Sequence, residues 1–186
     1  EAAAVAGAVH SRGFLAAARA SGVLAAVMAP RPEPANLVAN GSFEQSAGEG
    51  PSSWTSRVNG GEAELTLARG QGRNGGNALR ISSDSGADAS WVGPEIRLEP
   101  NTRYRIEAWM RTREVDRGTS RGALISMGGL SPALTRINPV EGTTGWTRYE
   151  RTFTAPEAAV GRMEVALGGG RGVSTGEILI DDVVVH

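Results

Sequence analysis

The chain has 186 residues, 40% of them hydrophobic, which is enough to bury one core, and its formal net charge of −1 points neither to nucleic acid nor to an anionic membrane as a partner. It contains no cysteine, so disulfides, thiolate nucleophiles and cysteine-based zinc sites are excluded. Its two histidines, His10 and His186, lie near the two ends, and we therefore expect no catalytic histidine and no histidine-rich metal site.

Residues 1–29 are rich in alanine and differ in composition from the rest of the chain. Arg12 precedes an apolar run that ends in small residues, a pattern typical of a secretory signal, although Arg19 interrupts the run. The alternative is an alanine-rich helix or frayed leader. A membrane-spanning helix is disfavoured because both arginines would lie in the hydrocarbon. Residues 30–35, which contain "PRPEP", are expected to form an extended linker.

The rest of the chain, residues 36–186, has the pattern of short strands. A first strand is expected to begin at Leu37. Apolar and polar residues then alternate in eight segments separated by turn-forming clusters, at 63–68, 78–82, 95–99, 103–111, 123–127, 146–154, 162–167 and 177–185. No part of this region shows a convincing apolar period of 3.6 residues. Strands this short and evenly spaced predict an all-β, antiparallel β-sandwich.

Six motifs occur in a recognisable order: "NLVANGSFE", "PSSW", "GNALRI", "IRLEPNTRYRIEAWMR", "GWTRYERTFTAP" and "ILIDDVVV". Together they resemble the β-jelly-roll carbohydrate-binding modules of families 4, 9 and 22, in the galactose-binding-like superfamily. The resemblance covers residues 36–186. It implies a secreted or cell-surface bacterial protein that binds a polysaccharide or oligosaccharide without catalysis and is covalently linked to a catalytic domain. Since the superfamily also serves other roles, a structural or adhesive β-sandwich domain of a bacterial surface protein, with no sugar affinity, is the alternative.

Carboxylates at the two ends of this domain suggest a metal site. The first and last strands of such a jelly roll can run close together, which would bring Glu44 near Asp181 or Asp182. A carboxylate beside an apolar anchor such as Phe43 is costly unless it is paired or bound to a cation, and no arginine is evident between these groups. Hard oxygen ligands suit Ca²⁺. The resemblance likewise implies a structural calcium, held by Glu44, Asp181 and Asp182. The alternative is that the aspartates end the last strand in solvent and Glu44 caps a turn.

Sugar binding relies on exposed aromatic rings flanked by polar groups. Alternation in the 103–111 segment places Tyr104, Ile106, Ala108 and Met110 inward and leaves Trp109 outward with Arg105, Glu107 and Arg111. The same alternation, counted in "SWVGPEIRLE", places Trp91 outward. If "EPNT" is a tight hairpin turn, Trp91 and Trp109 are neighbours on an exposed face, and these five outward residues form the predicted ligand site. If the turn crosses between two sheets, the two rings are separated. A further alternative is that loops cover them.

Catalysis by this domain is not expected. Glycoside hydrolysis uses a pair of carboxylates, and Glu95 and Glu107, both placed on the predicted tryptophan face, are the pair to examine. Such chemistry normally needs a deep site, and a small sandwich with short loops offers little room for one. We therefore expect a non-catalytic accessory module whose folded domain does not insert into a membrane.

Overall fold

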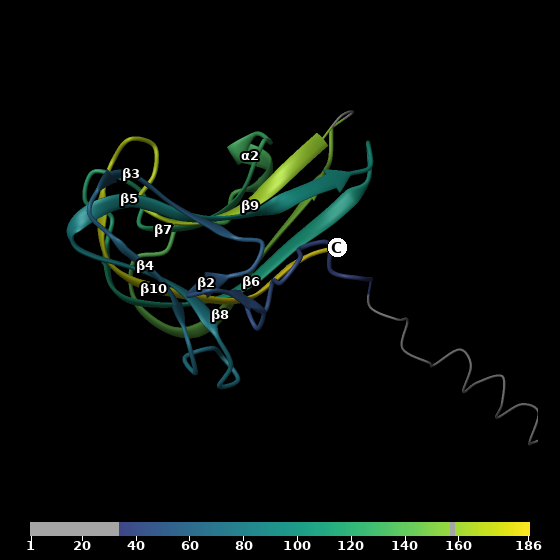
Figure 1. Cartoon of the computed structure of the whole chain (residues 1–186). Coiled ribbons are helices and arrows are strands. Elements are labelled where there is room, and N and C mark those ends of the chain that lie inside the picture. The colour runs from purple at the N-terminus through teal and green to yellow at the C-terminus, as the bar shows by residue number, and fades with distance from the viewer. Residues whose placement is uncertain (1–33, 157–158) are drawn as a thin grey trace, which may run out of the picture. The chain divides into compact units, whose positions relative to one another are not determined.

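Ten β-strands and one short helix make up the regular structure of residues 34–156 and 159–186, the part of the chain that the computed structural model describes (Figure 1). They are β1 (Ser46–Ala47), β2 (Gly50–Pro51), β3 (Thr55–Gly61), β4 (Glu64–Ala68), β5 (Ala78–Leu98), β6 (Arg103–Asp116), β7 (Ala123–Gly128), α2 (Pro132–Thr135), β8 (Gly142–Thr154), β9 (Ala159–Leu167) and β10 (Ser174–Val185). The expectations for residues 1–29, and for most of the linker at 30–35, concern residues outside this part. Within it, no helix is long and apolar enough to cross a membrane.

Strands β3 to β10 form one antiparallel sheet that folds over into two layers, because the long strand β5 belongs to both, and β1 and β2 pair only with each other. The first part of β5, residues 78–83, pairs with β4 and β10, and its second part, residues 87–98, pairs with β3 and β9. The first layer continues from β10 to β6 and β8, and the second from β9 to β7. We call them the β6 layer and the β9 layer; Figure 1 shows the β9 layer above and the β6 layer below. The predicted all-β antiparallel sandwich is confirmed.

Side chains of the two inner faces fill the space between the layers. The four residues of β6 that alternation placed inward, Tyr104, Ile106, Ala108 and Met110, are all buried. Large apolar residues of β9 and β10 meet them in the same core cluster. Burial of one such aliphatic side chain contributes about 1.5–3 kcal/mol, so this shared core holds the two layers together.

The predicted first strand at Leu37 is wrong, because this part of the chain is a series of turns. No strand is present at residues 34–45, and Asn40 and Phe43 have positive φ angles of 52° and 60°, which are typical of turns. The segment is nevertheless tied to β10: the Leu37 N–H donates to the carbonyl of Val185 at 2.9 Å, and the Val183 N–H donates to the carbonyl of Gly41 at 2.8 Å. The beginning and the end of the domain therefore meet as predicted, through turns instead of a strand.

A β-bulge in β5 reverses the alternation of its side chains. Val92 pairs with Glu164 of β9, but the next pair joins Glu95 to Arg162, so β5 has one residue more than its partner. The extra residue lies at Gly93–Pro94, where proline lacks the N–H that a regular ladder needs. Counting back in steps of two from the buried residues after the bulge therefore assigns the residues before it to the wrong face.

Candidate functional site

The predicted tryptophan pair is wrong, because Trp91 belongs to the core. Its side chain is 5% exposed, and its indole N–H donates to the carbonyl of Arg80 at 3.1 Å. The alternation that placed it outward was counted through the bulge at Gly93–Pro94. Trp109 lies in the other layer, paired with Asp181 of β10. The "EPNT" turn therefore crosses between the layers, which is the arrangement that separates the two rings.

The other four predicted ligand residues lie on the outer face of the β6 layer, and three of them are engaged by neighbouring side chains. The half-buried ring of Trp109 lies under the guanidinium of Arg73, 4.4 Å from ring centroid to Cζ. Glu107 forms ion pairs with Arg105 and Arg148. The groups around Trp109, Arg105 and Glu107 are thus already engaged and have little hydrogen-bonding capacity left for a sugar. The fourth residue, Arg111, contacts the ring of Trp146 and has no carboxylate within ion-pair distance among the described residues.

The carboxylate pair considered for hydrolysis does not exist. Glu95 lies in the β9 layer, where it forms an ion pair with Arg162 at 2.6 Å, and Glu107 lies in the β6 layer. The alternation correctly placed Glu95 outward, but the expected common face also depended on a tight hairpin at "EPNT", and that turn crosses between the layers. Two carboxylates in different layers cannot flank one glycosidic bond.

The carboxylates at the two ends of the domain do come together, under the loop that connects β4 and β5. The Arg73 N–H donates to Oδ2 of Asp181 at 2.8 Å, and the Asn77 N–H donates to Oε1 of Glu44 at 2.9 Å. Asp182 has a positive φ of 49° beside a register shift in β10, and its Oδ2 accepts from Nη2 of Arg73 at 2.7 Å. The expectation of no arginine among these carboxylates was therefore wrong.

Asp181 is the buried carboxylate of this cluster. It is 5% exposed. Burial raises the pKa of its carboxyl above the ordinary value, the N–H groups of Arg73 and Asp182 oppose this, and the nearby carboxylates of Asp182 and Glu44 raise the pKa further. Burial thus makes the ionised form of Asp181 less favourable in the folded chain than in water, and a nearby cation would oppose this effect.

The donors around Asp181 fit a hard cation such as Ca²⁺. A Cβ added at Gly72 would lie 2.5 Å from the carbonyl oxygen of Asn77 and 2.9 Å from Oδ2 of Asp181, and one added at Gly76 would meet Oε1 of Glu44. Oxygens of Asn77 and Asp181 thus lie close to Gly72, and the carboxylate of Glu44 lies against Gly76. No group of three or more His, Cys, Asp or Glu side chains suited to a metal occurs among the described residues, so backbone carbonyls would have to complete the shell.

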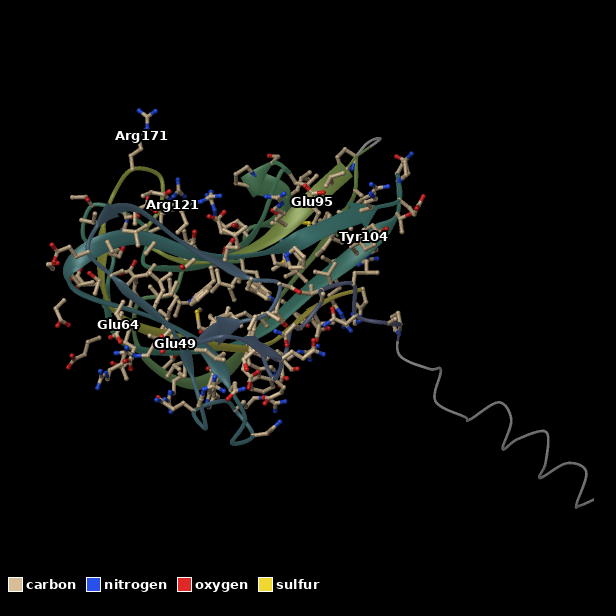
Figure 2. All side chains as sticks on the ribbon, in the orientation of Figure 1. Glu49, Glu64, Glu95, Tyr104, Arg121 and Arg171 are labelled. Carbon is tan, nitrogen blue, oxygen red and sulfur yellow. The ribbon has the colours of Figure 1, made fainter. Side chains whose placement is uncertain are left out.

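A groove of about 270 Å³ on the outer face of the β9 layer was not predicted. It is lined by Arg57, Val92, Glu95, Gly128, Gly129, Val160, Arg162 and Glu164. Figure 2 labels Glu95 on this layer. Glu95 and Arg162 pair with each other, whereas the side chains of Arg57 in β3 and Glu164 in β9 have no hydrogen-bond or ion-pair partner in residues 34–156 and 159–186. The exposed side chain of Val160 adds an apolar wall.

The groove combines groups that suit a sugar. A guanidinium offers donors and a carboxylate offers acceptors, and neighbouring hydroxyls of a pyranose both donate and accept. Apolar walls suit the C–H faces of the ring. Alternation within the predicted strand 162–167 already put Arg162 and Glu164 on one face. Nothing in the sequence around Arg57 indicated a strand, and this groove was therefore missed.

The comparisons with known proteins give the same fold. The chain is similar to the module TmCBM61, solved with β-1,4-galactotriose (TM-score 0.56, 19% identity, 82% of this chain and 99% of that one). It is also similar to the CBM22-1–GH10 modules of a Clostridium thermocellum xylanase, solved with xylohexaose (TM-score 0.52, 16% identity, 82% of this chain), and to the enzymatically active domain of tailspike protein 4 of bacteriophage CBA120 (TM-score 0.57, 19% identity, 81% of this chain).

The matched region spans only 28% of the xylanase fragment and 21% of the tailspike domain. No curated protein sequence matches the chain significantly. The sequence profile of the family described as "Carbohydrate binding domain" (CBM_4_9), however, matches residues 35–173, more than half of the chain. With the jelly-roll sandwich and a groove suited to a sugar in place, the chain belongs to this family of carbohydrate-binding domains.

Proposed function

We propose that the domain binds a polysaccharide or oligosaccharide, without catalysis, in the groove on the outer face of the β9 layer. The observation that carries this proposal is the pair of unpartnered groups in the groove, Arg57 and Glu164. A charged group that lines a groove and has no protein partner keeps its full capacity for hydrogen bonds to a ligand.

In this mode of binding, Arg57 donates two parallel hydrogen bonds to neighbouring hydroxyl oxygens, and Glu164 accepts from hydroxyl groups of the same or the next ring. Val92 and Val160 cover C–H surface of the sugar. The groove, at about 270 Å³, is no larger than the smallest sites for drug-sized ligands, which start near roughly 300 Å³. The domain therefore holds a short part of the glycan, and the remainder lies in solvent.

A domain of this kind serves an enzyme to which it is attached. A flexible link between the two raises the concentration of the catalytic domain at the polysaccharide without any new chemistry. We include a secreted or cell-surface location in the proposal, since this is where such a substrate is met. Family membership and the xylanase match, in which a binding module and a GH10 module occur in one chain, support this arrangement.

We also propose that Glu44 and Asp181, with backbone carbonyls such as that of Asn77, hold a structural Ca²⁺. The convergence of oxygen atoms around Gly72 and the disfavoured charge of buried Asp181 support it. A bound cation would supply the positive charge that Asp181 lacks and would tie the start of the domain to β10.

Substitution of the unpartnered groups tests the sugar site. Arg57→Ala and Glu164→Gln are each expected to weaken glycan affinity about tenfold or more, since a hydrogen bond to a charged group contributes about 1.5–3 kcal/mol. Unfolding free energies should change by no more than about 0.5 kcal/mol, because neither side chain has a partner to lose. Affinity electrophoresis and calorimetry against a panel of neutral plant and bacterial polysaccharides measure the first effect, and urea unfolding the second.

Arg103→Ala is the matched control, because Arg103 is an exposed arginine at the start of β6, in the other layer. It should bind as the parent does. Absence of binding to every glycan of the panel would favour a structural or adhesive β-sandwich instead. Glycan binding that survives both groove substitutions would place the sugar elsewhere.

A further inference from the structure

A second and larger groove, of about 620 Å³, lies on the outer face of the β6 layer. It is lined by Gln71, Arg80, Arg111, Thr112, Arg113, Thr143, Thr144, Gly145 and Glu177. Three guanidinium groups thus face one carboxylate. The groove of the β9 layer has two of each, so of these two grooves it is the one on the β6 layer that carries an excess of positive charge.

The single carboxylate of this groove is mostly engaged by one arginine. Arg80 donates from Nε to Glu177 at 2.6 Å and pairs through Nη1 with Glu64 at 2.7 Å. Arg113 is two-thirds exposed and reaches Glu177 only at 3.4 Å. Arg111 has no carboxylate within ion-pair distance in the described part of the chain. The uncompensated charge of the groove therefore lies at Arg111 and Arg113.

Arg111 is held in place by an aromatic ring instead of a counter-charge. Its Cζ lies 5.6 Å from the ring centroid of Trp146, which packs on a small apolar cluster of Ala68, Ala78 and Leu179. This cluster fixes the ring, and the ring limits the positions of the guanidinium. A positioned guanidinium loses less conformational entropy when it binds an anion.

The neighbouring Arg73 makes the same kind of contact with a ring, but its charge is neutralised by a carboxylate. Arg73 lies over Trp109 at 4.4 Å, and its guanidinium is neutralised by Asp182 at 2.7 Å. Arg111 over Trp146 repeats the pairing of arginine and ring on the same layer without the carboxylate. No carboxylate of the described residues takes at Arg111 the place that Asp182 takes at Arg73.

We propose that this groove is a second binding site, which takes the carboxylate or sulfate group of an acidic sugar through Arg111 and Arg113. The fork of a guanidinium matches either group with two parallel hydrogen bonds. At the rim, the Thr143 Oγ1 accepts from the Glu114 N–H at 2.9 Å, which leaves its hydroxyl proton for a sugar oxygen. The Gln71 side chain offers a donor and an acceptor to hydroxyls of the same ring.

This site goes beyond the proposed function, because it is in the other layer and uses none of its residues. It would let the domain hold a charged glycan, or charged substituents on a mostly neutral one, independently of the first groove. The affinity of this site for an acidic sugar should fall as the salt concentration rises, since the screening length for exposed charges is about 8 Å at physiological ionic strength.

Calorimetry on the full chain with three probes tests the proposal: a galacturonate hexasaccharide, a heparin-derived hexasaccharide and neutral cellohexaose, at low and at physiological salt. We expect at least one anionic probe to bind, and its affinity to fall about tenfold in Arg111→Gln and beyond detection in the double variant Arg111→Gln/Arg113→Gln. Binding of the first probe identifies a carboxylate as the ligand, and binding of the second a sulfate.

Arg103→Gln, which removes the same charge from the same strand away from the groove, must bind the anionic probe as the parent does. The proposal is overturned if neither anionic probe binds, or if Arg103→Gln weakens binding as much as Arg111→Gln. It is also overturned if Arg57→Ala abolishes binding of the anionic probe and Arg111→Gln does not, since the acid sugar then lies in the first groove. Failure of the proposed function is distinguishable from these results: neutral glycan would then bind Arg57→Ala and Glu164→Gln as tightly as it binds the parent.

Discussion

Trp91→Ala is expected to lower the free energy of unfolding by about 3–5 kcal/mol, the range for large aromatic side chains removed from a core. Trp91 is 5% exposed, and its indole N–H bonds to the carbonyl of Arg80, in the first part of the same strand. It therefore ties together the two parts of β5 that belong to different layers. Each kcal/mol shifts the midpoint of thermal unfolding by about 2–4 °C at this size, so a fall of roughly 6–20 °C is expected.

Two variants separate the contributions of Trp91. Trp91→Phe keeps most of the ring volume but leaves the Arg80 carbonyl without its donor, which costs about 1–3 kcal/mol for a buried acceptor. Trp109→Ala is the matched surface control, and its half-buried ring should matter less than half as much. Urea and thermal unfolding measure all three. If Trp91→Ala unfolds like the parent but binds glycan weakly, Trp91 belongs to a binding face after all.

The outcome for Trp91 shows where reasoning from the sequence succeeds and where it fails. Period-two alternation correctly identified the inner face of β6, because that strand has no irregularity between Arg103 and Met110. The same reasoning failed in β5, where Gly93–Pro94 adds a residue and reverses the faces. A glycine followed by proline inside a strand is a known mark of a bulge, and it was the available signal.

The groove of the β9 layer illustrates a different limit. Its residues come from β3, β5, β7 and β9, and which strands are neighbours depends on long-range pairing that one sequence does not reveal. Arg57 lies in β3, a strand rich in polar residues and glycine with no buried residue, so no apolar alternation marks it. Glu164 sits in a clear alternating pattern, but its partner across the groove was unknown.

The meeting of Glu44 and Asp181 was predictable, because the two motifs lie at the ends of one jelly roll. The part played by Arg73 was not. The sequence of the loop "RGQGRNGGN" (69–77) indicates only a turn, yet its backbone N–H groups bind both carboxylates and Arg73 pairs with Asp182. This difference decides which carboxylates remain for a cation: Asp181 and Glu44, but not Asp182.

Removal of calcium is expected to lower the thermal midpoint of the domain by roughly 5–11 °C. An ion that binds only the folded chain adds about 2.7 kcal/mol when its free concentration is 100 times the dissociation constant. Each kcal/mol corresponds to about 2–4 °C for a domain of this size. Scanning calorimetry in excess calcium, in chelator, and after calcium is restored measures the effect. Magnesium should restore little, since it requires a tighter octahedral shell and gives up its waters reluctantly.

Three substitutions assign the ligands. Glu44→Gln and Asp181→Asn should each remove most of the stabilisation by calcium and leave a midpoint that no longer responds to chelator. Asp182→Asn is the matched control: its carboxylate is held by Arg73, so this variant loses that ion pair and still responds to chelator. Equal loss of response in all three would make Asp182 a ligand as well and would mean that Arg73 moves away when the ion binds. If neither chelator nor added calcium changes the thermal midpoint of the parent, the cation site does not exist. The two backbone N–H groups of the loop are then enough to stabilise the carboxylates of Glu44 and Asp181.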